Sequence, residues 1–179
     1  MCLPSTIRGL RRAIERGELE LHYQPKVSFH GNVVVGSEAL LRWRRPGVGL
    51  APPNEFIPLA EETGLIVDLG NWVLREACRT AAEWNAAAGS VSHRVAVNLS
   101  ARQFRFHDFV SMVNDILVET GCRPEWLELE ITESVLLAED DAMLNTLSSF
   151  REIGLSIAID DFGTGYSSLS YLARFQLTR

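Results

Sequence analysis

The sequence lacks the features that define several common functional classes. Lys26 is the only lysine among 17 basic residues, so a phosphate-binding loop of the Gly-Lys-Ser/Thr type cannot occur. The 3 cysteines form no Cys-x-x-Cys pair, and an odd number favours a reducing compartment over a disulfide framework. No apolar run reaches the roughly 18 residues of a membrane-spanning helix, and the N-terminus has no signal-peptide core. The net charge of −6 does not favour binding to a nucleic-acid polymer. We therefore expect a cytoplasmic protein that contacts no membrane.

Short apolar strand patterns alternate with longer helical patterns along the 179 residues. The apolar fraction of 46% and the length are typical of one domain with a large core. Strands are expected at 19–27, 33–43, 94–100, 127–133 and 156–161, and helical segments at 53–88, 109–121 and 140–154. Because strands and helices alternate, the pattern predicts an α/β fold with parallel strands joined by helical crossovers.

The two faces of each expected strand differ in character. Leu127, Leu129 and Ile131 share one face, whereas Glu128 and Glu130 share the other, and the strands at 94–100 and 156–161 repeat this division. A parallel strand covered by helices on both faces is normally apolar on both. A face of small and polar residues is typical of the interior of a barrel, with its polar groups at the mouth. A doubly wound open sheet is the alternative architecture.

Oxygen-bearing side chains lie at the C-terminal ends of four expected strands. They are Glu38, Asn98, Glu130, Asp160 and Asp161. Because parallel strands point their C-terminal ends the same way, these groups can meet at one rim. Clustered carboxylates repel one another unless cations bind, and oxygen donors favour Mg²⁺, Mn²⁺ or Ca²⁺ over zinc. Such a set of ligands can hold two metal ions, the arrangement used for in-line attack on phosphate esters. The alternative is that each acid caps a helix or forms a surface ion pair.

Five motifs follow one another along the chain: Tyr23-Gln-Pro25, Glu38-Ala-Leu-Leu-Arg-Trp43, Asn98-Leu-Ser100, Glu130-Ile-Thr-Glu133 and Asp160-Asp-Phe-Gly-Thr-Gly-Tyr-Ser-Ser-Leu169. Together they resemble the EAL domain, a family of bacterial cyclic-di-GMP phosphodiesterases that act in second-messenger signalling. The resemblance implies a TIM-type (β/α) barrel whose first strand is antiparallel. Residues 1–179 would then be a single partial EAL domain with about five of the eight barrel strands.

The resemblance also implies roles for individual residues. The five groups at the strand ends would bind Mg²⁺ or Mn²⁺, with Ca²⁺ acting as an inhibitor, during hydrolysis of cyclic-di-GMP to linear pGpG. Gln24, Leu40 and Arg42 would contact the dinucleotide. Glu133 would brace the loop after Asp161, which couples dimerisation to metal binding in this family.

The chain departs from the family pattern at its end. Family members continue through a Lys-Ile-Asp strand and a later glutamate, whereas this sequence reads to Arg179 and stops. The catalytic lysine of the family is therefore absent, and Lys26 cannot be assumed to replace it. The Met1 start would also leave no room for an upstream sensor domain.

We expect little or no turnover by this chain alone. Homo-oligomers should form through open sheet edges or through the loop after Asp161. The alternative function is a non-catalytic module that binds cyclic-di-GMP or another protein.

Overall fold

The computed structural model describes residues 3–28, 31, 33–87, 92–106, 108–132 and 141–160. Its elements in chain order are α1 (Leu3–Glu15), β1 (Leu19–Val27), β2 (Val34–Arg45), β3 (Gly49–Ala51), the 3₁₀ helix η1 (Pro53–Glu55), α2 (Ile57–Thr63), α3 (Ile66–Ala87), β4 (Arg94–Leu99), α4 (Ala101–Phe104), α5 (Phe109–Thr120), the 3₁₀ helix η2 (Pro124–Trp126), β5 (Leu127–Thr132), α7 (Asp141–Ile153) and β6 (Ser156–Asp160).

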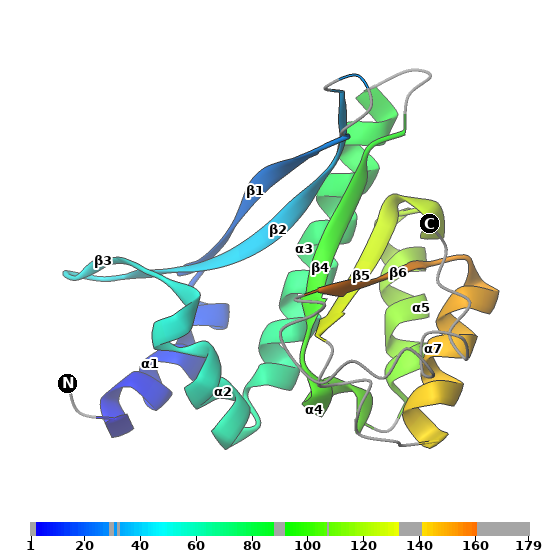
Figure 1. Cartoon of the computed structure of the whole chain (residues 1–179). Coiled ribbons are helices and arrows are strands. Elements are labelled where there is room, and N and C mark those ends of the chain that lie inside the picture. The colour runs from blue at the N-terminus through cyan, green and yellow to red at the C-terminus, as the bar shows by residue number, and fades with distance from the viewer. Residues whose placement is uncertain are drawn as a thin grey trace.

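The strands form one mixed sheet in the order β1-β2-β4-β5-β6, and β3 pairs with β2 outside this path. β1 lies antiparallel to β2, whereas β2, β4, β5 and β6 run parallel to one another. The predicted antiparallel first strand is confirmed. The long helices α3, α5 and α7 lie along one side of the sheet (Figure 1). A doubly wound sheet carries helices on both sides, so the partial barrel is the correct description of the described residues.

The helix-covered face of the sheet forms the core. Val95, Val97, Leu127 and Leu129 are at most 1% exposed. α3 presents a stripe of buried residues at helical spacing to this face: Ile66, Leu69, Val73, Leu74, Ala77, Cys78 and Ala81. Burial of this stripe fixes the position of α3 across the sheet. No helix within the described ranges combines the length and the apolar character that crossing a bilayer requires.

The structure corrects several boundaries. The single helical segment expected at 53–88 is divided into η1, α2 and α3, because Gly64 ends α2 in the left-handed conformation at φ 79°. The strand expected at 33–43 runs from Val34 to Arg45. α1, α4 and the short β3 were not predicted. α4 and β3 are too short to give a clear apolar period, whereas α1 carries Ile7, Leu10 and Ile14 at helical spacing, a signal that was available in the sequence.

β2 and β4 pair over only four residues. Gly36 to Ala39 match the segment from Arg94 to Val97, after which the two strands separate. Gly36 permits the close pairing at its start, because a Cβ there would lie 2.6 Å from the carbonyl oxygen of Arg94. Beyond Ala39, the β1–β2–β3 ribbon extends away from β4, with α2 beneath it (Figure 1). The separation opens a space beside the C-terminal end of β4.

Candidate active site

The strand register brings the predicted site residues to one face of the sheet. Gln24 of β1 pairs with Glu38 of β2. Asn98 of β4 pairs with Glu130 of β5, and Asp160 is the register partner of Thr132, two residues beyond Glu130. These positions alternate with the buried residues of the core, so their side chains point to the face opposite α3, α5 and α7. Among the described residues, Glu38, Asn98, Glu130 and Asp160 thus share one face of the sheet, which the convergence expected at one rim requires.

Glu38 and Asn98 are joined directly across the β2–β4 pair. Asn98 Nδ2 donates a hydrogen bond to Glu38 Oε1 at 2.7 Å. Glu38 is half-buried and Asn98 is exposed. The bond fixes the amide with its nitrogen toward Glu38, so an oxygen of each side chain remains able to bind a ligand.

Glu130 is the most buried of the predicted site residues that the structure describes. It is only 7% exposed, and its Oε2 atom is buried without a hydrogen-bond partner. Burial raises the pKa of the Glu130 carboxyl above its usual range, and the charges of Glu38 and Glu128 act in the same direction. A hydrogen bond from Lys26 acts in the opposite direction by favouring the charged form. A buried carboxylate oxygen that lacks a partner is the expected state of an atom that binds a cation.

Lys26 lies among Glu38, Glu128 and Glu130, which form the acidic face of the sheet. The sequence pattern did not predict its contacts there. Its Nζ donates to Glu130 Oε1 at 2.6 Å and to Glu128 Oε1 at 2.5 Å. Burial alone would lower the pKa of Lys26, but the two carboxylates overcome this effect and raise it. The signal was available in the strand pattern, because Lys26 lies two residues from Gln24 and therefore on the same face of β1.

Two of the predicted residues fall outside the described residues. Asp161 directly follows β6, and Glu133 directly follows β5. Asp160, the last residue of β6, is exposed. Among the described ranges, no three acidic, histidine or cysteine side chains form a ready metal site. The oxygen donors of Glu38, Asn98 and Glu130 nevertheless fit Mg²⁺ or Mn²⁺ by their chemistry, and Glu130 Oε2 supplies the unpaired atom.

The residues predicted to contact the dinucleotide lie on the same side of the β1–β2 hairpin. Gln24 is exposed and Leu40 is half-buried. Arg42 is half-buried, and its Nη1 donates to the carbonyl oxygen of Leu41 at 2.9 Å. The structure therefore places all three on the same face of β1 and β2 as Glu38, but it does not test their roles.

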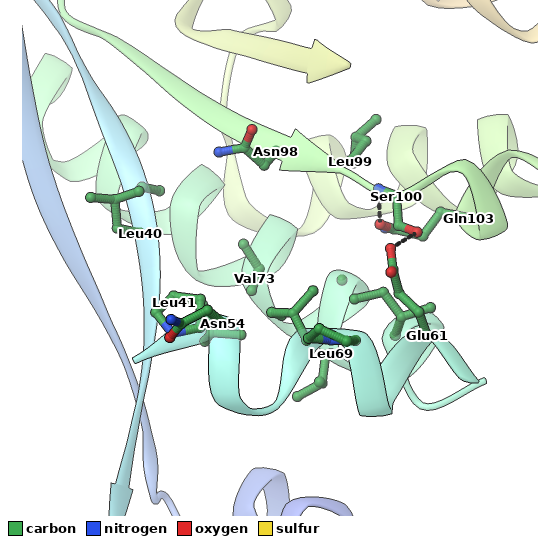
Figure 2. Close-up of a pocket in the computed structure, with 16 residues that line it drawn as sticks. Leu40, Leu41, Asn54, Glu61, Leu69, Val73, Asn98, Leu99, Ser100 and Gln103 are labelled. Carbon is green, nitrogen blue, oxygen red and sulfur yellow. Dashed lines mark hydrogen bonds between the residues drawn. The ribbon is translucent and has the colours of Figure 1, made fainter. Parts of the chain in front are cut away.

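A cavity of about 400 Å³ lies where β2 separates from β4. Figure 2 shows Leu40 on one side of it and Asn98 above, with α2 and α3 forming the opposite wall. Its walls are mainly apolar, and Asn54, Glu61 and Gln103 contribute polar groups. Because Asn98 both lines the cavity and bonds to Glu38, the cavity adjoins the acidic residues.

A hydrogen-bonded network supports the wall of the cavity below Asn98. Ser100 Oγ donates to Glu61 Oε1 at 2.7 Å, and the backbone nitrogen of Ser100 donates to Gln103 Oε1 at 3.0 Å. Ser100 and Gln103 form a capping box at the start of α4. Sequence reasoning missed this network, although the spacing of serine and glutamine is a helix-start signal. Gly70 permits the packing, because a Cβ there would lie 2.1 Å from Gln103 Nε2.

Comparisons with known proteins agree with this geometry. The EAL domain model matches residues 7–179. The chain is 49% identical over 168 residues to MucR of Pseudomonas aeruginosa, described as a bifunctional diguanylate cyclase/cyclic di-GMP phosphodiesterase, with 94% of this chain and 24% of MucR covered. It is 44% identical over 169 residues to the Escherichia coli K12 cyclic di-GMP phosphodiesterase PdeR, with 94% and 25% covered. The chain thus spans about a quarter of the length of these curated relatives.

A solved structure of the PaMucR phosphodiesterase in complex with c-di-GMP matches the fold with a TM-score of 0.91 at 47% identity. The match covers 98% of this chain and 70% of that chain. The EAL enzyme Bd1971, in its form bound to cAMP and cyclic-di-GMP, matches with a TM-score of 0.85 at 31% identity, covering 98% of this chain and 49% of that chain. The fold, the order of the motifs and these similarities establish that the chain belongs to the EAL domain family.

Proposed function

We propose that this chain binds cyclic-di-GMP and divalent cations as part of a phosphodiesterase that converts the dinucleotide to linear pGpG. One structural observation carries the proposal. Glu130 presents a buried, unpartnered carboxylate oxygen on the same face as the bonded Glu38–Asn98 pair, beside a cavity. Similarity to a phosphodiesterase structure solved with c-di-GMP supports the choice of substrate.

The proposed metal ligands are the five predicted oxygen donors, of which Glu38 lies within β2 and not at its C-terminal end as expected, and Mg²⁺ or Mn²⁺ is the proposed cofactor. The ligands are Glu38, Asn98, Glu130, Asp160 and Asp161. Bound divalent cations would activate water at neutral pH and neutralise charge on the phosphate. Without such cations the carboxylates would repel the anionic substrate, because Lys26 is the one lysine of the chain and already contacts Glu130 and the neighbouring Glu128. We propose that Ca²⁺ permits binding but inhibits turnover.

The residues of the chain itself bind and orient the dinucleotide. We assign a guanine base to the cavity beside Leu40, where apolar walls cover its faces and Asn54 offers a polar group to its edge. Gln24 is assigned to guanine and Arg42 to phosphate. Arg42 would exchange its bond to the Leu41 carbonyl for a charge-assisted bond to a phosphate oxygen.

Turnover by residues 1–179 alone should be weak, because the sequence contains no counterpart of the family's catalytic lysine. We also propose that the chain forms homo-oligomers through β1 or β6, the outer strands of the described order, or through the loop after Asp161. A cytoplasmic location is proposed with this function, since both described cysteines are free thiols.

The function can be tested by separating binding from chemistry. Calorimetry with cyclic-di-GMP in Ca²⁺ measures binding, and chromatography of reactions in Mn²⁺ measures pGpG. We expect wild-type protein to bind the dinucleotide only when a divalent cation is present, with slow formation of pGpG. Glu38→Gln should abolish the cation-dependent binding, because it replaces a charged ligand with a neutral amide.

The matched control is Glu62→Gln, which removes the same charge from an exposed position on α2. It should bind as the wild type does. Absence of cation-dependent binding in the wild type, or full binding by Glu38→Gln, would overturn the proposed function. Binding without any pGpG would show that residues 1–179 act by themselves as a binding module.

A further inference from the structure

Lys26 occupies a position inside the acidic face that none of the roles proposed above explains. Lys26 belongs to β1, yet its ammonium contacts two carboxylates of β5, although β2 and β4 lie between these strands in the sheet. The side chain of Lys26 is 37% exposed, whereas those of Glu128 and Glu130 are 16% and 9% exposed. The contacts are therefore sheltered from water on the carboxylate side, where ion pairs are stronger than at an exposed surface.

The two oxygen atoms of Glu130 have different surroundings. Oε1 accepts the hydrogen bond from Lys26 at 2.6 Å. Oε2 is buried and has no partner. Because the carboxylate is planar, a bond that holds Oε1 also fixes the direction of Oε2. Lys26 thus engages one oxygen and leaves the other without a hydrogen-bond partner.

Glu128 holds Lys26 in this position. Its Oε1 accepts from Lys26, and its Oε2 accepts from Arg94 Nη1 at 3.3 Å. Two cations and two carboxylates alternate in the order Arg94, Glu128, Lys26 and Glu130. Each charge in this row faces an opposite one, so the row can remain in place with Glu130 ionised.

We propose that Lys26, held by Glu128, is a positioning residue that orients Glu130 so that Oε2 alone is presented to the divalent cation. The inference rests on the proposed function, because it takes Glu130 as a cation ligand. It differs from a role for Lys26 as a competitor that the cation must displace. A competitor would be expected on the unpartnered oxygen, whereas Lys26 bonds to Oε1 and leaves Oε2 without a hydrogen-bond partner.

A positioning role predicts that removing the ammonium group weakens Mn²⁺ binding, whereas a competing role predicts that it strengthens Mn²⁺ binding. Mn²⁺ affinity is measured by calorimetry with the metal alone, and the free energy of unfolding by urea denaturation without metal. Lys26→Met should weaken Mn²⁺ binding by about 10- to 100-fold, the range typical of groups that orient a metal ligand. Lys26→Arg should recover most of the affinity, because a guanidinium can donate to the same two carboxylates.

A second variant leaves the ammonium in place. Glu128→Gln removes the charge that holds Lys26, and a smaller loss of Mn²⁺ affinity than in Lys26→Met is expected. This variant keeps the test valid if Lys26→Met does not fold. The exposed Glu62→Gln variant again serves as the charge-matched control and should bind Mn²⁺ normally.

The outcomes separate the two proposals. If wild type binds Mn²⁺ and Glu130→Gln does not, the metal role of Glu130 stands. Equal or tighter Mn²⁺ binding by Lys26→Met, or by Glu128→Gln where the first variant does not fold, would then overturn the positioning role alone. If wild-type protein binds no Mn²⁺, the proposed function fails before the role of Lys26 is reached.

Discussion

The two faces of the β4–β5 strand pair are built from opposite chemistry. On one face Val97, Leu129 and Ile131 are at most 1% exposed and pack beneath the helices. On the other face Asn98 and Glu130 are register partners that carry polar and charged groups. The first face supplies stability through buried apolar area. The second face buries a carboxylate at an energetic cost, which a structure retains where a ligand compensates for it.

Adjacent residues of one strand can therefore have opposite effects on stability. Leu129 and Glu130 are neighbours in β5, and both are largely buried. Leu129 gains free energy from leaving water, whereas the raised pKa of Glu130 shows that its charged form is disfavoured by burial. Substitutions at these two positions should therefore change the free energy of unfolding in different directions.

The largest effect is expected for Leu129→Ala on the helix-covered face. Leu129 is fully buried, so truncation removes apolar contacts and leaves a cavity. The free energy of unfolding should fall by about 2–5 kcal/mol, measured by urea denaturation. Val118→Ala is the control, because Val118 is 75% exposed and its truncation should cost less than about 0.5 kcal/mol. A loss at Leu129 as small as that at Val118 would contradict the assignment of this face to the core.

A smaller effect of the opposite sign is expected for Glu130→Gln without metal. The amide removes a charge that burial disfavours, and Lys26 retains Glu128 as a partner. The free energy of unfolding should stay equal to that of the wild type or rise, as at sites where function is maintained at the expense of stability. The same urea measurement checks this result. A clear loss of stability would show that the Lys26–Glu130 bond contributes more than the burial of the carboxylate costs.

The sequence pattern predicted the apolar, helix-covered face of β4 and β5 better than their polar face, for a physical reason. The alternation of Leu127, Leu129 and Ile131 reports burial directly, and β5 begins where it was expected. The same alternation placed Glu130 and Asn98 on one face, which the register confirms. Which side chains bond to one another depends on distances across the sheet, so strand parity could place Lys26 on this face but could not pair it with Glu130.

The remaining differences arise from tertiary context. Gly64 divides the expected long helix, although its neighbours continue a helical pattern. The cavity exists because β2 leaves β4 after Ala39, and no local sequence signal marks that separation. The resemblance to a family supplied what local pattern could not, namely the antiparallel pairing of β1 with β2.

The smallest predicted effect concerns His93, which lies on the helix-covered side. His93 Nε2 lies 3.0 Å from Ser37 Oγ, and its ring meets Trp84 edge-on at 5.0 Å. Burial lowers the pKa of His93, so the unfolded chain binds a proton more readily than the folded protein. The free energy of unfolding should therefore decrease as the pH falls through about 6.5, the ordinary histidine pKa. The loss continues to the lower pKa of the folded state, below which it is complete.

His93→Gln should reduce this pH dependence, because glutamine can bond to Ser37 but does not titrate in this range. The measurement compares urea denaturation of the two proteins at pH 7.5 and at pH 5.5, which lie on either side of about 6.5. Val118→Ala changes no titratable group and should keep the wild-type dependence. An unchanged dependence in His93→Gln would mean that protonated His93 is accommodated between Ser37 and Trp84. In that case the helix-covered side would tolerate a charge as the opposite face does, and the contrast between the two faces would be weaker than their burial implies.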